Sequence, residues 1–277
     1  MDLSSKKNVK NLLFERKIRP KKALGQNFLI SRRALCAVTK AAELSSDDIV
    51  LEIGPGIGNL TQELAKKAEK VITIEKDKEM IGVLRETLAD FNNVELIHGD
   101  ILKLDPKNLT PSPYKLVANL PYYIVAPVIR KFLESAEVQP PRLMVLMVQK
   151  EVAQRICSRP PDMNLLAISV QFYAEPKIIS YVPKNAFWPQ PKVDSAIIRL
   201  RVGGRKCRAD SGLFFRIARA GFSHPRKQLL NNLSQGMNIS RETAKNWLLK
   251  NALRPTQRAE TLNLQDWLNL AKSFKIN

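Results

Sequence analysis

The sequence has few of the residues on which metal and redox sites depend. It contains three cysteines and two histidines in 277 residues, and no two cysteines form a CxxC pair. We therefore expect no metal site and no disulfide framework, and reduced thiols favour a cytoplasmic location. No run of 18 apolar residues and no secretory signal is present. These absences predict a soluble protein without a membrane partner.

Acidic residues are also scarce, and the imbalance is concentrated at the two ends. The chain has 45 Lys and Arg against 26 Asp and Glu, a net charge of +19. Residues 1–24 carry eight basic and two acidic side chains, and residues 201–277 carry fifteen and four. This distribution favours a polyanionic partner, above all a nucleic acid. An anionic membrane surface, or a basic protein with no such partner, is the alternative.

Strand-like and helical patterns alternate through the central part of the chain. Short apolar, β-branched runs occur at residues 49–53, 71–74, 94–97, 115–118, 143–149 and 196–201. Helical patterns separate most of these runs, and a further helical pattern begins after Ser31, before the first run. Residues 165–173 fit either a strand or a helix. Nearly continuous apolar strands that alternate with helices predict an α/β fold, a parallel Rossmann-like sheet with helices on both faces.

The pattern changes at Gly203-Gly204, after which only helical patterns follow. We predict three parts. These are a flexible basic arm over residues 1–24, the Rossmann-like domain over residues 25–203, and a small, basic, all-helical domain over residues 204–277.

A glycine-rich turn follows the first apolar run, in the sequence Gly54-Pro55-Gly56-Ile57-Gly58. Such a turn lets a ligand approach the backbone, and the helix that follows presents free N–H groups. Glu75 ends the next run about twenty residues later, where a carboxylate can accept both hydroxyls of a ribose. Either a dinucleotide or S-adenosylmethionine (SAM) suits this arrangement. The third glycine comes one residue too early for the dinucleotide pattern.

Asp100 and Asn119 follow the next two runs, so four polar or glycine-rich strand ends occur in succession. Ligands of such sheets bind outside these carboxyl ends. SAM needs a carboxylate for its ribose and an acceptor for its adenine amine, and Glu75 and Asp100 supply them. The set therefore favours SAM over a dinucleotide.

The segment Asn119-Leu120-Pro121-Tyr122 suits chemistry on the amino group of an adenine. The N6 lone pair is delocalised into the ring, which makes it a poor nucleophile. The Asn119 amide and the Leu120 carbonyl can accept both N6 hydrogens, and Tyr122 can stack on the base. The alternative is a strand that ends in a proline turn with a core tyrosine.

Seven segments together resemble the ribosomal RNA adenine dimethyltransferases of the small subunit, the kasugamycin-sensitivity family. They are residues 22–29 (KALGQNFL), 52–61 (EIGPGIGNLT), 99–100 (GD), 119–124 (NLPYYI), 149–153 (QKEVA), 187–195 (FWPQPKVDS) and 226–233 (RKQLLNNL). The resemblance extends from about residue 20 to residue 262.

The resemblance implies a Rossmann-like SAM-dependent methyltransferase that acts on small-subunit (16S) rRNA. The product would be N6,N6-dimethyladenosine at two adjacent adenines in a hairpin loop near the 3′ end, made during ribosome biogenesis, and the enzyme is expected to be a monomer. The implied catalytic residues are Asn119, Leu120, Pro121, Tyr122 and Phe187, with Phe187 facing Tyr122 across the base. The implied cofactor residues are Asn27, Leu29, Gly54, Gly56, Glu75, Asp100 and Asn119. The implied RNA-binding residues are Arg226, Lys227, Asn231 and Asn232.

Two departures from the family pattern concern loops and RNA contacts. The family usually has a Tyr-Gly pair within residues 159–170, but residues 164–170 here lack the glycine, and Pro225 replaces the first Arg of the usual Arg-Arg-Lys. Three other functions stay open. They are a large-subunit rRNA adenine methyltransferase, a non-catalytic RNA-binding assembly factor, and a dinucleotide-dependent enzyme.

Overall fold

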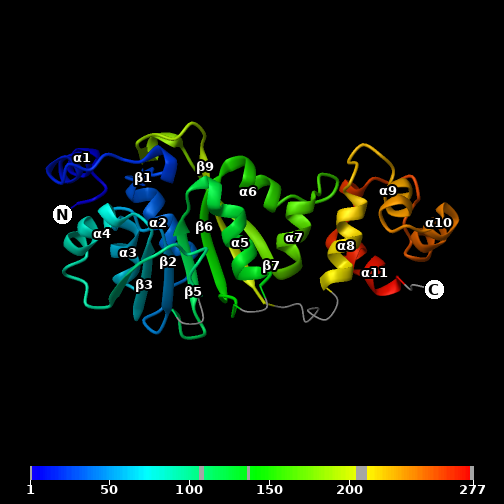
Figure 1. Ribbon diagram of the computed structural model, residues 1–277, viewed down its shortest axis with the longest axis horizontal. Helices are drawn as coiled ribbons and strands as arrows, with labels where there is room; N and C mark the ends of the chain where they lie inside the picture. Colours follow the sequence, from blue (N-terminus) through cyan, green and yellow to red (C-terminus); the bar gives the residue numbers. More distant parts are fainter. Residues whose placement is uncertain (1, 106–108, 136–137, 204–210, 275–277) are drawn as a thin grey trace. The chain divides into compact units, whose positions relative to one another are not determined.

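The computed structural model describes residues 2–105, 109–135, 138–203 and 211–274 (Figure 1). The chain divides into two compact units, residues 1–153 with 175–202 and residues 154–174 with 203–277. Within the described residues, no helix combines the length and apolar character needed to cross a membrane.

The first unit is built on a seven-stranded sheet in the order β4-β3-β2-β5-β6-β9-β7. Its strands are β2 (Ile49–Ile53), β3 (Lys70–Glu75), β4 (Val94–His98), β5 (Lys115–Asn119), β6 (Leu143–Gln149), β7 (Ala174–Val182) and β9 (Ser195–Val202). Strands β2 to β6 run parallel, whereas β9 pairs antiparallel with β6. The sheet is therefore mixed rather than wholly parallel, and β7 at its edge was not predicted.

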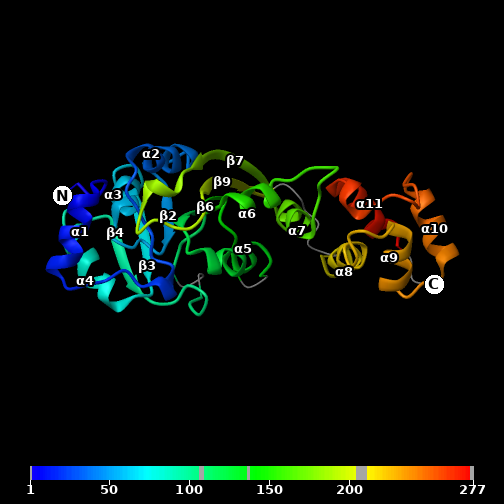
Figure 2. The same cartoon turned by 90° about the horizontal axis from the view of Figure 1, so that it is seen from above.

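Helices cover both faces of this sheet. They are α2 (Arg32–Ala41), α3 (Asn59–Ala65), α4 (Lys78–Thr87), α5 (Val125–Leu133) and α6 (Lys150–Ile156). Helices α2 and α5 lie on opposite faces (Figure 2). Apolar side chains of α2 and α3 share one core cluster with Val50, Val117 and Val145 of the strands. The predicted helix after Ser31 is confirmed as α2, because the Ser31 hydroxyl accepts from Ala34 N and caps it.

The predicted flexible arm is wrong for much of residues 1–24, which contain helix α1 (Lys6–Glu15). Leu3 and three apolar residues of α1 are buried against Phe28, Ile57, Met80 and Val83. The three are Val9, Leu12 and Leu13. Their i, i+3, i+4 spacing forms an apolar stripe along one face of the helix. The prediction of a flexible arm relied on the many basic residues of this segment and overlooked the stripe.

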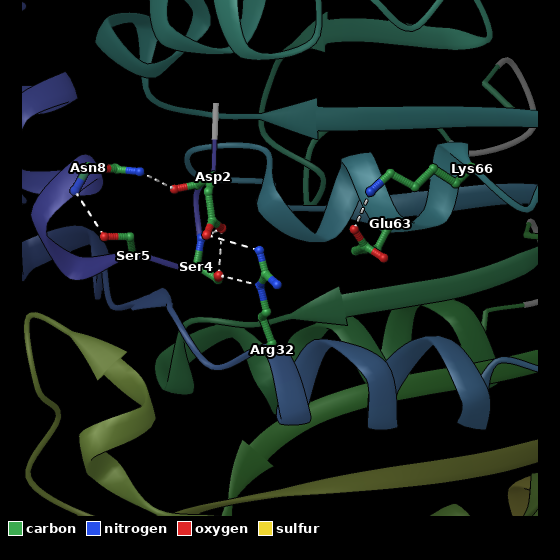
Figure 3. Close-up of polar contacts among 7 residues, drawn as sticks. All are labelled: Asp2, Ser4, Ser5, Asn8, Arg32, Glu63 and Lys66. Carbon is green, nitrogen blue, oxygen red and sulfur yellow. Dashed lines mark hydrogen bonds and ion pairs between the residues drawn. The ribbon is translucent and has the colours of Figure 1, made fainter.

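Polar contacts at the start of the chain hold this segment onto α2 (Figure 3). The Asp2 carboxylate accepts from the Arg32 guanidinium at 3.0 Å and from the Ser4 hydroxyl at 2.6 Å. Arg32 Nε also donates to the Ser4 hydroxyl, and the Asn8 amide donates to the Asp2 carbonyl, each at 3.0 Å. These groups are exposed, so the buried apolar stripe contributes most of the stability.

The second unit is helical. Its helices are α7 (Leu165–Tyr173), α8 (Ser211–Gly221), α9 (Leu229–Gly236), α10 (Arg241–Lys250) and α11 (Leu264–Ser273). They enclose a single apolar cluster in which Phe172 of α7 contacts Phe214 of α8, with ring centroids 4.3 Å apart. Helix α7 resolves the ambiguity at residues 165–173. It also belongs to the helical unit, whereas we expected it in the Rossmann-like domain. The predicted boundary at residue 204 lies outside the described residues.

Candidate active site

A cavity of about 320 Å³ lies in the first unit, at the carboxyl ends of β2, β3 and β5. Every residue predicted to bind the cofactor or act in catalysis lines it. These are Asn27, Leu29, Gly54, Gly56, Glu75, Asp100, Asn119, Leu120, Pro121, Tyr122 and Phe187. Parallel strands bring their carboxyl ends to one edge of the sheet, so residues from 27 to 187 converge there. The volume suits a ligand the size of a nucleoside with a side chain.

The glycine loop forms one wall of the cavity. Gly54, Gly56 and Gly58 have φ angles of +67°, +60° and +88°, in the left-handed region that favours glycine. A Cβ at Gly56 would lie 3.0 Å from the Phe28 ring, so a side chain there would push Phe28 out of place. Phe28 also lines the cavity, and sequence reasoning did not select it.

Glu75 is held in a fixed orientation at the end of β3. One carboxylate oxygen accepts from Asp77 N at 2.7 Å, and the other accepts from Gly56 N at 3.3 Å. Its side chain is buried, and burial raises the pKa of this carboxyl above its ordinary value. Each oxygen keeps a lone pair, so the pair of oxygens can accept two neighbouring hydroxyls of a ribose.

Asp100 is paired with a lysine that sequence reasoning missed. Lys76 Nζ lies 3.0 Å from Asp100 Oδ2, and Leu102 N donates to Asp100 Oδ1 at 3.0 Å. Burial opposes ionisation, but the Lys76 and Leu102 hydrogen bonds outweigh it and lower the pKa of Asp100. Asp100 is therefore ionised, so its oxygens act only as acceptors, to which an adenine amine can donate. The position of Lys76 directly after Glu75 was the only signal in the sequence.

Asn119 and the turn after it form another wall of the cavity. The Asn119 amide nitrogen donates to the Asn27 carbonyl at 3.4 Å, which leaves the amide oxygen for a ligand. Pro121 precedes a short 3₁₀ turn (Tyr122–Ile124). A Cβ added to Gly25 would lie 3.1 Å from the Cβ of Pro121, so the two segments are in close contact. The residues around 25–27 and the Asn119 segment thus support each other.

Tyr122 and Phe187 line the cavity from different elements. The Tyr122 hydroxyl lies 2.9 Å from the Ser195 hydroxyl, and burial raises the pKa of Tyr122, so the ring stays neutral. Phe187 is buried in the two-residue strand β8 (Phe187–Trp188), where it pairs with Leu29 of β1 (Phe28–Leu29). This small ribbon brings residues 27–29 next to the Phe187 segment.

Glu52 is a further cavity residue that the sequence did not single out. It is 1% exposed, and its Oε2 accepts from the hydroxyls of Thr61 at 2.6 Å and Thr73 at 3.1 Å. Burial raises the pKa of Glu52 to about 7, although the two threonine hydrogen bonds oppose the shift. Glu52 therefore ties α3 to β2 and β3 behind the glycine loop.

Glu52 predicts a distinct pH dependence of stability. The pKa of Glu52 in the folded protein lies above its ordinary value of 4.5. The contribution of Glu52 to the free energy of unfolding is therefore complete below pH 4.5 and is lost as the pH rises through about 7. The free energy of unfolding of the native protein, minus that of Glu52→Gln, should fall by on the order of 3 kcal/mol across this range. Urea titrations of both proteins at several pH values measure the difference. Parallel pH curves would contradict the assignment.

The predicted RNA-binding residues lie in the second unit, and one of them is placed against expectation. Arg226 and Lys227 are exposed, and Asn231 is half-buried. Asn232 is 1% exposed, and its amide donates to the carbonyls of Gly221 at 2.7 Å and His224 at 3.0 Å. The prediction that Asn232 contacts RNA is therefore wrong, because its side chain fixes the turn that follows α8.

Comparison with known proteins identifies the family. The family model for ribosomal RNA adenine dimethylase matches residues 17–275. The chain belongs to this family. It is therefore a SAM-dependent methyltransferase that acts on adenine in ribosomal RNA, and the residues of its cavity fit that cofactor. Helix α1 lies outside the residues that the family model matches.

Relatives of this dimethylase extend over nearly the whole chain. Ribosomal RNA small subunit methyltransferase A of Dehalococcoides mccartyi is 44% identical over 94% of this chain and 90% of the relative. The protein of the same name from Alkaliphilus metalliredigens is 41% identical over 97% and 96%.

Two solved structures share the fold of this dimethylase. A dimethyladenosine transferase from Plasmodium falciparum has a TM-score of 0.73 and 30% identity, with 87% of this chain and 94% of that chain covered. The 23S rRNA methyltransferase ErmE has a TM-score of 0.75 and 27% identity, with 89% and 99% covered.

Proposed function

We propose that this protein methylates N6 of two adjacent adenines in a hairpin loop near the 3′ end of small-subunit rRNA, to N6,N6-dimethyladenosine. The observation that carries the proposal is the Asn119–Tyr122 segment, which lines the same cavity as Glu75 and Asp100. The small-subunit methyltransferases at 44% and 41% identity support the choice of substrate. The immature small subunit is the proposed partner, and the protein is proposed to act as a cytoplasmic monomer.

The residues around the cavity divide between cofactor and substrate. Glu75 accepts the ribose hydroxyls of SAM, Asp100 accepts its adenine amine, and Asn27, Leu29, Gly54 and Gly56 shape the rest of its site. When bound, SAM supplies an activated methyl group. The ionised Asp100 and the fixed Glu75 carboxylate therefore orient the cofactor without taking part in the transfer.

The target adenine contacts the wall that contains Asn119. Asn119 and the Leu120 carbonyl accept the two N6 hydrogens, which draws the lone pair out of conjugation and makes N6 more nucleophilic. Tyr122 and Phe187 contact the faces of the base, and Pro121 sets the turn that positions the Leu120 carbonyl. Tyr122 is engaged with Ser195 and neutral, so it acts as a stacking surface and not as a base.

Mass spectrometry of rRNA tests the proposal. Unmethylated small-subunit particles are incubated with the protein and SAM, with large-subunit particles in parallel. Two adjacent dimethyladenosines near the 3′ end of the small-subunit rRNA are expected. Methylation confined to large-subunit rRNA would instead favour the function named for ErmE, whose fold is shared but whose identity is lower. Binding of the particles without any methylation would favour an assembly factor.

Arg226 and Lys227 are proposed to contact RNA phosphates. Each neutralised phosphate releases counterions, so Arg226→Ala and Lys227→Ala should each reduce the slope of log affinity against log salt by about 1. RNA binding measured at several salt concentrations gives this slope. Lys66→Ala is the matched control, because Lys66 is exposed but already paired with Glu63 at 2.5 Å (Figure 3). If all three variants had the slope of the native protein, the proposed phosphate contacts would be excluded.

A further inference from the structure

Large apolar side chains that remain exposed are few among the described residues. The exposed ones are Phe14, Leu102, Tyr123, Tyr181, Val193 and Leu249. Leu102 and Tyr123 line the cavity. Tyr181, near the end of β7, and Val193, just before β9, have no place in the proposed function so far. Their side chains are 52% and 44% exposed.

Tyr181 carries a cation over its ring. Lys150 Nζ lies 5.2 Å from the centroid of the Tyr181 ring, within the range of a cation–π contact. Lys150 begins α6, directly after β6. Since Lys150 covers one side and the residue is still half exposed, the ring keeps an accessible surface.

Lys150 and the residues that contact Asp194 link this tyrosine to the wall of the cavity. Asp194 accepts from Lys150 N through its carbonyl and from Lys184 N through its carboxylate, each at 3.0 Å. The next residue, Ser195, contacts the Tyr122 hydroxyl at 2.9 Å. The loop between Tyr181 and Ser195 is thus fastened at both ends, and its middle carries Phe187 into the cavity.

Strand register places the cavity and the end of β7, which carries Tyr181, at the same edge of the sheet. Ser195 pairs with Gln149, and Asn119 pairs with Met147, two residues earlier on the same strand. Lys184 closes the loop onto Asp194, so the end of β7 lies at this edge as well. Lys150, Lys184 and Lys192 are exposed around the loop, which adds positive charge suited to a phosphate backbone.

We propose that Tyr181, backed by Lys150, stacks an unpaired nucleobase that neighbours the target adenine in the substrate RNA. This inference rests on the proposed function. A base turned into a pocket leaves its neighbours without a stacking partner, and an exposed aromatic ring at the same edge of the sheet as the pocket replaces that partner. Stacking uses the ring face, so the phenolic hydroxyl is not required and the identity of the base matters little. Tyr181 is therefore a substrate-binding residue outside the cavity.

Two variants of the full-length protein separate this role from others. Tyr181→Ala should raise the KM for RNA roughly 10-fold, since stacking on one aromatic contributes about that much, and leave kcat within about 2-fold. Tyr181→Phe should keep both values within about 2-fold. A hairpin of the substrate loop with 2-aminopurine beside the target adenine reports stacking, because its fluorescence should be quenched by the native protein and by Tyr181→Phe but not by Tyr181→Ala.

The outcomes distinguish the inference from the proposed function. An unchanged KM and unchanged quenching in Tyr181→Ala overturn the stacking role, while methylation of small-subunit rRNA by the native protein leaves the proposed function intact. Loss of SAM affinity in Tyr181→Ala also overturns it, because the side chain would then support the fold of the cavity. If the native protein methylates only other RNA, the proposed function itself fails.

Discussion

Asn119→Ala is expected to lower the rate of methyl transfer by on the order of 10²–10³-fold, the cost of removing one group that stabilises a transition state. The amide oxygen of Asn119 is the side-chain acceptor proposed for N6, and its nitrogen is already engaged with Asn27. Without that acceptor, the N6 lone pair stays conjugated with the ring. Single-turnover methylation of small-subunit particles measures the effect.

The dissociation constant for SAM should change only several-fold in this variant, because Glu75 and Asp100 are unaltered. Asn119→Asp is the matched control, since it retains an acceptor oxygen at the same position and should recover part of the rate. A transfer rate in Asn119→Ala equal to that of the native protein would exclude the role assigned to Asn119.

Glu75→Ala is expected to weaken SAM binding by roughly 10²-fold, since two hydrogen bonds to a charged acceptor are lost together. Glu75→Gln keeps the shape of the side chain but not its charge, and should give an intermediate dissociation constant. Isothermal titration with SAM measures all three proteins. A Glu75→Ala titration that matches the native one would show that the ribose is held elsewhere.

The same carboxyl predicts a pH dependence of cofactor binding. Only the ionised form accepts from both hydroxyls, so SAM affinity should fall as the pH decreases through the pKa of Glu75. Burial raises this pKa, so the decline should begin at a higher pH than for an exposed glutamate. Asn119→Ala should show the same decline, whereas Glu75→Gln should lack it.

Several elements could not be assigned from the sequence because local pattern alone does not decide them. Residues 165–173 are almost wholly apolar, which suits a buried strand as well as a helix. The Asn164 side chain accepts from Ala167 N and caps the helix, and Phe172 packs on Phe214. Strand β7 contains charged residues and a proline, and it is a strand because β9 offers it an edge.

The sequence by itself determined strands β2 to β6 and β9, helix α2, the glycine loop, and the polar residues at successive strand ends. These features are local, or follow from the rule that parallel strands expose their carboxyl ends at one edge. Tertiary structure alone decided that α1 packs behind Phe28, that Lys76 pairs with Asp100, and that Asn232 is buried. It also brought Tyr181 to Lys150 and Ser195 to Tyr122. Most of these contacts join residues far apart in the chain, and no periodicity or spacing in the sequence encodes which distant side chains will meet.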